Sequence, residues 1–242
     1  MVDKANGMNL RASTAIALLA LMPNAVWAGN IGGTVVIRRS LTRRTVTPAA
    51  NAYQRGVAVP LGQDSGEDPL GFERTHVVIY LDEKGTPDVA VTAVMEQRGR
   101  RFLPDLLVVP TGSTVSFPNR DLIFHNVFSF SKPKTFDLGN YPKDHTRVVT
   151  FTKPGIVLLN CRLHPNMGAA IVVTPSQWAT RADASGEFVL TNIPAGKHTV
   201  VAWHKAAGFF RQNVEVSETG NARVQFLIPF AAEDGASPAA AE

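Results

Sequence analysis

Short runs in which apolar and polar residues alternate recur along most of the chain, and this spacing is typical of strands. In residues 113–117, for example, Val115 and Phe117 fall on one face. Turn-forming residues (Gly, Pro, Asn and Asp) separate the runs. We therefore predict an all-β fold. Strands are predicted at 31–37, 75–81, 89–97, 102–110, 113–117, 123–130, 147–151, 156–161, 169–174, 187–190, 198–204, 214–216 and 222–228.

Two segments lack this alternation and are predicted to be loops. Residues 38–74 are rich in Arg, Gly, Pro and Asp, with one short strand expected at 56–60. Residues 132–144 form the second predicted loop.

The first 28 residues are predicted to be a signal peptide. Lys4 and Arg11 precede an apolar run at 12–22, and small residues stand near Ala28. The run is too short to span a bilayer, and no later run is long enough. We expect a mature chain that begins near Gly29, is periplasmic or secreted, and has no membrane span. An uncleaved N-terminal anchor is the alternative.

The mature chain divides into four sections. Residues 89–175 carry the densest strand pattern and predict an antiparallel sandwich with Greek-key connections. Residues 176–230 predict a second, smaller β-sandwich. Residues 29–88 form an N-terminal β segment with a long basic loop, and their strand at 31–37 could join the second sandwich. The acidic, Ala-rich tail at 231–242 is predicted to be disordered.

The formal net charge is +4, and part of it is concentrated in the long loop. Such a cluster could attract an acidic partner at low salt. The cluster has little aromatic interleaving, and the predicted export argues against nucleic acid as a partner. A solvated loop without a partner is the alternative interpretation. The arginines are Arg38, Arg39, Arg43, Arg44 and Arg55.

One segment holds three possible ligands for a soft metal ion. Cys161, the only cysteine, is followed by His164 and Met167. A disulfide within the chain is therefore impossible, and a metal bond would protect the thiolate in an oxidising compartment. His125, on an upstream strand, can supply a second imidazole. Thiolate, two imidazoles and a thioether are the ligand set of a blue copper site.

A zinc site, other kinds of copper centre and a hydrolase active site each explain these residues less well than a blue copper site does. Zinc could bind Cys and His, but Met is a poor zinc ligand. A dinuclear electron-transfer copper centre needs two cysteines, and a multicopper oxidase needs His-x-His pairs that are lacking here. A hydrolase would leave Met167 and His125 unexplained. Four further histidines are predicted to be surface or strand residues: His76, His145, His198 and His204.

Five short motifs follow one another between residues 90 and 175. Together they resemble the cupredoxin family, in particular its amicyanin, pseudoazurin and plastocyanin branch. They are most similar to exported methylamine-utilisation-type or plastocyanin-like proteins. The motifs are F-L-P at 102–104, F-P-N-R-D at 117–121, F-H-N-V-F-S at 124–129, F-D-L-G at 136–139 and C-R-L-H-P-N-M-G-A at 161–169.

The resemblance implies a Greek-key cupredoxin sandwich with one type-1 copper. Its ligands would be His125, Cys161, His164 and Met167, with Asn126 joining the ligand-bearing segments by hydrogen bonds. The ring edge of His164 would reach the surface, where Pro165 and apolar neighbours would dock a partner. The chain departs from many small cupredoxins in having Leu163 where they have Pro, which affects loop stiffness but removes no ligand.

A second resemblance covers residues 183–204. The pattern D-x-x-G-x-F followed by I-P-A-G-x-H-x-V is similar to the carboxypeptidase-regulatory-like or transthyretin-like sandwich. This resemblance implies an architecture and no chemistry.

Two functional hypotheses follow. The first is a non-enzymatic electron carrier that docks with a redox protein such as a cytochrome or a periplasmic dehydrogenase. The second is a copper-binding, sensing or structural double sandwich without redox turnover. Reversible one-electron cycling of bound copper distinguishes them.

Overall fold

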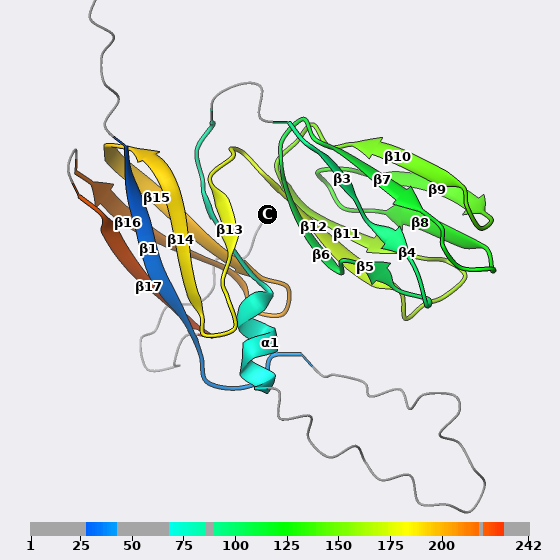
Figure 1. Ribbon diagram of the computed structural model, residues 1–242, viewed down its shortest axis with the longest axis horizontal. Helices are drawn as coiled ribbons and strands as arrows, with labels where there is room; N and C mark the ends of the chain where they lie inside the picture. Colours follow the sequence, from blue (N-terminus) through cyan, green and yellow to red (C-terminus); the bar gives the residue numbers. More distant parts are fainter. Residues whose placement is uncertain (1–27, 43–67, 86–89, 218–219, 230–242) are drawn as a thin grey trace, which may run out of the picture.

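The computed structural model describes residues 28–42, 68–85, 90–217 and 220–229 (Figure 1). Apart from Ala28, the predicted signal peptide lies outside these residues, as do the predicted strand at 56–60, three of the loop arginines and the tail at 231–242. Almost every described element is a strand, so the prediction of an all-β sandwich fold is confirmed. The described part contains no helix long and apolar enough to cross a membrane.

The first sandwich combines both ends of the described chain. In one sheet, β1 lies between β14, to which it is antiparallel, and β17, to which it is parallel. In the other, the order is β13-β2-β15-β16. We call this unit the terminal sandwich. Its strands are β1 (Ala28–Ile37), β2 (Val77–Leu81), β13 (Ala179–Arg181), β14 (Glu187–Pro194), β15 (Gly196–His204), β16 (Gly208–Val216) and β17 (Ala222–Ile228).

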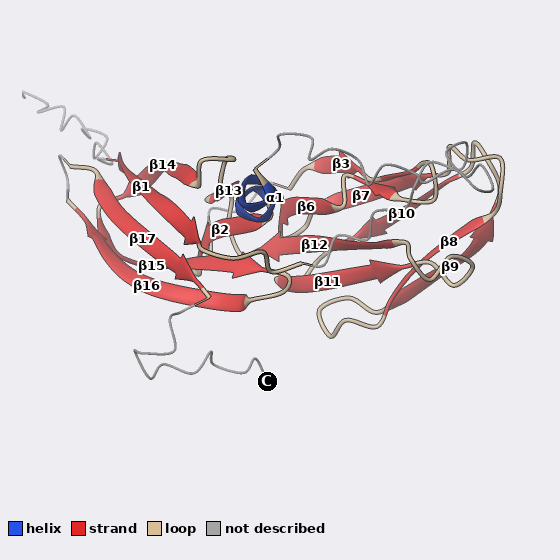
Figure 2. Ribbon diagram, turned by 90° about the horizontal axis from the view of Figure 1, so that it is seen from below, coloured by secondary structure: helices blue, strands red, loops and turns tan. Residues whose placement is uncertain are grey.

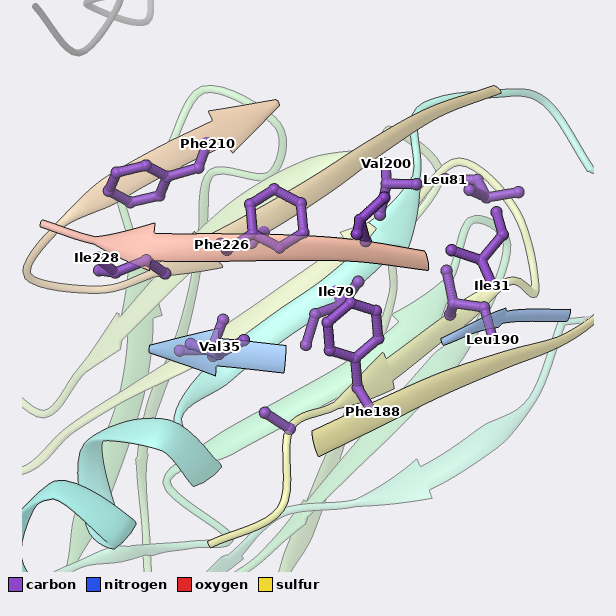
Figure 3. Packing of buried hydrophobic residues seen from close by; sticks show 14 of the residues in the cluster. Ile31, Val35, Ile79, Leu81, Phe188, Leu190, Val200, Phe210, Phe226 and Ile228 are labelled. Carbon is purple, nitrogen blue, oxygen red and sulfur yellow. The ribbon is translucent and has the colours of Figure 1, made fainter. Parts of the chain in front are cut away.

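Figure 3 shows the core of the terminal sandwich, where side chains of the two sheets meet. Alternation supplies these side chains. Val77, Ile79 and Leu81 of β2 all point into this core, and so do Val200 and Ala202 of β15. The carboxypeptidase-regulatory-like assignment of residues 176–230 stays a prediction.

The second unit, the central sandwich, is formed by the middle of the chain. Its sheets have the orders β10-β7-β3 and β6-β12-β11-β8-β9, and a short β4-β5 hairpin accompanies them. Phe117, Phe151 and Leu159 are among the side chains buried between the sheets. Its strands are β3 (Thr92–Val94), β4 (Glu96–Gln97), β5 (Phe102–Leu103), β6 (Leu106–Pro110), β7 (Thr114–Pro118), β8 (His125–Ser129), β9 (Phe136–Tyr141), β10 (Thr146–Thr150), β11 (Gly155–Asn160) and β12 (Gly168–Thr174).

A third apolar cluster joins the two sandwiches, which lie side by side in Figures 1 and 2. Strands β2 and β15 contribute the residues that point away from their own core, such as Val78 and Trp203. Strands β6 and β12 contribute Leu106, Ala170 and Val172. Strands β2, β12 and β15 are therefore largely buried on both faces, whereas β6 is partly buried. Hydrophobic burial stabilises the contact between the sandwiches.

The predicted loop at 38–74 contains a helix, α1 (Pro69–Thr75), and β2 begins at Val77 instead of residue 75. The Asp68 side chain caps the helix by accepting a hydrogen bond from the backbone N–H of Leu70. Pro is favourable in the first helical turn, where its missing N–H costs nothing. Pro69 and Gly71 favoured the loop prediction, although this segment forms a capped helix.

The predicted loop at 132–144 contains strand β9, which pairs antiparallel with β8. Its sequence holds Asp137, Gly139 and Asn140, residues that are rare in strands. Strand β9 is the edge of its sheet, and a register shift opposite β8 accommodates this sequence. The loop prediction was therefore wrong for these six residues.

Candidate metal centre

The four predicted ligands lie on one strand and on one turn between two neighbouring strands. Cys161 directly follows β11, and Met167 directly precedes β12, which pairs antiparallel with β11. The turn between these strands therefore carries Cys161, His164 and Met167. His125 begins β8, which pairs with β11 on its other side. Sheet pairing thus brings residues 36 positions apart next to each other.

The structure places His125, Cys161 and His164 in one cluster, with their ligand atoms all within 4.8 Å of one another. The two Nδ1 atoms are 3.1 Å apart. The Cys161 Sγ lies 4.0 Å from Nδ1 of His125 and 3.8 Å from Nδ1 of His164. His125 and Cys161 are buried, whereas His164 is half-buried.

Met167 lies in the same buried cluster of the central sandwich as Cys161. Its backbone N–H donates to the carbonyl of His164 at 2.9 Å, which closes the turn between the two residues. Only 1% of Met167 is exposed. The turn therefore returns the chain to the core and leaves His164 nearer the surface.

This donor set is suited to a soft metal ion. Ligand atoms that share one metal ion at about 2.0–2.3 Å lie about 3–4 Å apart, as the three described atoms do. A thiolate with imidazoles suits both zinc and copper, but a neighbouring thioether favours copper. The residues present therefore fit copper better than zinc.

Asn126 connects the segments that carry the ligands. Its backbone N–H donates to Cys161 Sγ at 3.4 Å, and its side-chain Oδ1 accepts from the N–H of Arg162 at 3.4 Å. Its Nδ2 donates to Asp137 at 2.7 Å and to the carbonyl of Gly139 at 3.2 Å. One buried amide therefore links β8 to β9 and to the turn after β11.

Asp121 contacts the site, although the sequence analysis named it only as part of the F-P-N-R-D motif and gave it no role. Its Oδ2 lies 2.8 Å from Nε2 of His125. The hairpin tip at Gly99 and Arg100 also donates two backbone N–H groups to this carboxylate. The spacing of four residues between Asp121 and His125, within the F-P-N-R-D motif, was the signal that could have revealed it.

Electrostatics around the site favour a neutral His164. Burial lowers the pKa of this imidazole, and the neighbouring His125 and the positive charge of Arg100 act in the same direction. Neutral imidazole is the form that binds metal. Burial disfavours the charged form of Tyr141 as well, which for a phenol means a raised pKa. The Tyr141 hydroxyl donates to the carbonyl of Phe117 in the core.

The other histidines lie away from this cluster. His145 is exposed, and His198 of β15 contacts Glu83 at 3.0 Å. His76 follows α1 and lies 3.3 Å from Asp105. His204 is buried at the end of β15, with Nε2 3.1 Å from a Glu73 oxygen. In the described part of the chain, none of the four belongs to a group that could hold a metal.

Exposed apolar and basic side chains adjoin the ligands along the chain. Phe124 precedes His125 and is 54% exposed, and Leu163 precedes His164 and is 44% exposed. Leu122 is 88% exposed. Arg100, at the tip of the β4-β5 hairpin, is also exposed. The surface beside the site therefore mixes apolar and positively charged groups.

No protein-family model and no curated protein matches this chain. Among solved structures, it is similar to a copper-containing nitrite reductase from Thermus scotoductus SA-01, with 28% identity over 38% of this chain and 24% of that chain (TM-score 0.32). A purple cupredoxin from Nitrosopumilus maritimus is 21% identical over 34% of this chain and 99% of its own (TM-score 0.32). An amicyanin variant in the Cu(I) form is 22% identical over 39% of this chain and 97% of its own (TM-score 0.32). The chain thus spans about a quarter of the reductase and nearly all of the two smaller proteins.

Proposed function

We propose that this chain is an exported type-1 copper protein that carries single electrons to or from a redox protein. The observation that carries the proposal is the cluster of His125, Cys161 and His164, with Met167 in the same buried core. Copper bound there would supply a reversible one-electron couple. No enzymatic turnover is proposed, since these residues provide metal ligands and no arrangement for a substrate.

The protein contributes a site that changes little between two charge states. Cys161 and His125 are held by hydrogen bonds from Asn126 and to Asp121, and both are buried. Burial excludes water from these two ligands, and the fixed hydrogen bonds reduce the rearrangement that a change of charge would otherwise require. These residues therefore favour electron transfer over substrate binding.

The partner would dock where His164 approaches the surface. Exposed Phe124 and Leu163 precede the two histidine ligands and offer apolar contact, and Arg100 adds positive charge. A cytochrome or a periplasmic dehydrogenase is the kind of partner that we propose. Apolar contact with few fixed ion pairs suits a short-lived complex.

A second function is a copper-binding, sensing or structural module. The terminal sandwich favours this alternative, since it packs on the central sandwich through an apolar cluster that a small shuttle would not need. Reversible reduction and reoxidation of the bound copper would argue for the carrier, and a copper that stays in one state would argue for the module.

The test is a titration of the metal-free protein with Cu(II), followed by optical and EPR spectroscopy. We expect an intense visible thiolate-to-copper band and a narrow copper hyperfine splitting in the unchanged protein. Cys161→Ser should lose both, because a hydroxyl does not replace the thiolate.

The matched control is His145→Gln, which removes an exposed histidine outside the cluster. It should leave both signals unchanged. A colourless unchanged protein, or one in which His145→Gln removes the signal, would contradict the proposed site.

A further inference from the structure

The two histidines of the cluster differ in what holds them. The described hydrogen bonds of the His164 ring both involve Nδ1, and this residue is half-buried. His125 is fully buried, and its Nε2 lies 2.8 Å from an Asp121 carboxylate oxygen. An ionised carboxylate can only accept, so the ring proton of His125 is on Nε2. Its Nδ1 lone pair therefore faces Cys161 and His164.

Asp121 is itself firmly held. The backbone N–H groups of Gly99 and Arg100 donate to its two oxygens at 2.7 and 2.9 Å. Both of these residues have positive φ, 60° and 56°, which points their successive N–H groups in the same direction. Asp121 also donates its own N–H to Asn119 Oδ1 at 2.9 Å. The carboxylate thus has a fixed position beside His125, and 17% of its side chain is exposed.

We propose that Asp121 is a positioning residue that fixes the ring of His125, strengthens its Nδ1 as a ligand and favours Cu(II) over Cu(I). This inference rests on the proposed function. A negative charge hydrogen-bonded to the far nitrogen raises the basicity of the ligating one. The more highly charged ion gains more from such a ligand, so the reduction potential is held lower than a neutral acceptor would allow.

Asp121→Asn tests this role with little change of shape. An asparagine has one acceptor oxygen, so it cannot accept from His125, Gly99 and Arg100 as the carboxylate does. We expect Cu(II) binding to weaken about 10–100-fold. The potential should rise by about 59 mV for each tenfold loss of Cu(II) binding in excess of Cu(I) binding. The thiolate band should persist at a shifted wavelength.

Glu96→Gln is the matched control. Glu96 lies on the same hairpin and pairs with Arg98 and Arg120, but it contacts no predicted ligand. Its removal deletes one negative charge and should leave the potential and the Cu(II) affinity unchanged. Equal shifts in the two variants would overturn the proposal, because net charge alone would then explain them. An unchanged potential and affinity in Asp121→Asn would also overturn it.

A second measurement needs no substitution and no copper. In the metal-free protein labelled with ¹⁵N at histidine, the ring proton of His125 should be on Nε2 and exchange slowly with water. Rapid exchange, or a proton on Nδ1, would overturn the role of Asp121 even if Asp121→Asn does not fold. By contrast, a slowly exchanging Nε2 proton without any thiolate-to-copper band supports the hydrogen bond and refutes the proposed function. The two failures are therefore distinguishable.

Discussion

Asn126 occupies a position where the side chain and the backbone act on different parts of the site. Its backbone N–H reaches the sulfur of Cys161, while its amide joins Asp137, Gly139 and Arg162. The resemblance to cupredoxins indicated a residue that ties two segments together. The structure adds a third, β9, which the sequence analysis assigned to a loop.

Asn126→Ala should lower the stability of the metal-free protein by about 1–3 kcal/mol, because the substitution removes the three hydrogen bonds that the buried Asn126 amide makes. Asn140→Ala is the control, since Asn140 lies opposite Asn126 on β9 and is exposed. It should change stability by at most about 0.5 kcal/mol. Urea unfolding followed by circular dichroism measures both. Equal losses in the two variants would show that the buried amide contributes nothing specific.

Strand β1 is the middle strand of the three-stranded sheet in the terminal sandwich and pairs with β14 on one edge and with β17 on the other. At Gly33 the neighbouring strands leave no room for a side chain. A Cβ there would lie 2.1 Å from the backbone oxygen of Val224 and 2.6 Å from the ring of Phe188. At Gly32 the nearest atom to a Cβ is 3.9 Å away. Lack of space therefore requires a glycine at position 33 but not at position 32.

Gly33→Ala should destabilise the terminal sandwich by about 1–3 kcal/mol, because backbone or ring must shift to admit the methyl group. Gly32→Ala should be close to neutral, since its methyl group meets only ordinary contacts. Thermal unfolding of the two variants measures the difference. The copper spectrum should be the same in both, as β1 belongs to the other sandwich. A lower midpoint for Gly32→Ala than for Gly33→Ala would refute this account of β1.

At the scale of the whole molecule, an ion pair between His76 and Asp105 connects the two sandwiches within the described part of the chain. His76 follows α1, and Asp105 precedes β6. Burial, the largest influence, would lower the pKa of His76, but the hydrogen bonds to Asp105 and to the carbonyl of Phe72, together with the negative charge of Asp105, outweigh it and raise the pKa. The same bond lowers the pKa of Asp105. Both groups thus carry charge over a wider pH range in the folded protein than in the unfolded chain.

These directions predict how the stabilisation by the pair depends on pH. A raised histidine pKa gives stability that is complete below about pH 6.5 and is lost as the pH rises through the folded value. A lowered aspartate pKa gives stability that is present above about pH 4 and is lost on acidification. The unfolding midpoint of the unchanged protein should therefore exceed that of Asp105→Asn most between about pH 4 and 6.5.

Thermal unfolding between pH 4 and 9 measures this difference. Burial lowers the pKa of His204, which opposes the trend, but this residue is equally buried in both proteins, so its burial does not distinguish them. An advantage of the unchanged protein that grows above pH 7 would contradict the assigned pair.

The pattern along the chain was sufficient for most strands, because a strand with one buried face alternates with period two. It was also sufficient for the spacing of Cys161, His164 and Met167, since a short turn keeps such residues together. Local composition misled the analysis at α1 and β9, where Gly, Pro and Asn suggested loops. There, the cap by Asp68 and the pairing with β8 outweighed local preference.

Other features depend on contacts between distant segments, which no local pattern encodes. Strands β2 and β15 are buried on both faces because a second sandwich covers the face that alternation would leave to solvent. His125 joins Cys161 because β8 pairs with β11. The Asp121 carboxylate accepts hydrogen bonds from His125 and from the tip of the β4-β5 hairpin. These groups come within hydrogen-bonding distance only when the chain folds. The sequence was thus sufficient to predict which residues are ligands, whereas the groups that orient them, such as Asp121, were determined by the packing of distant segments.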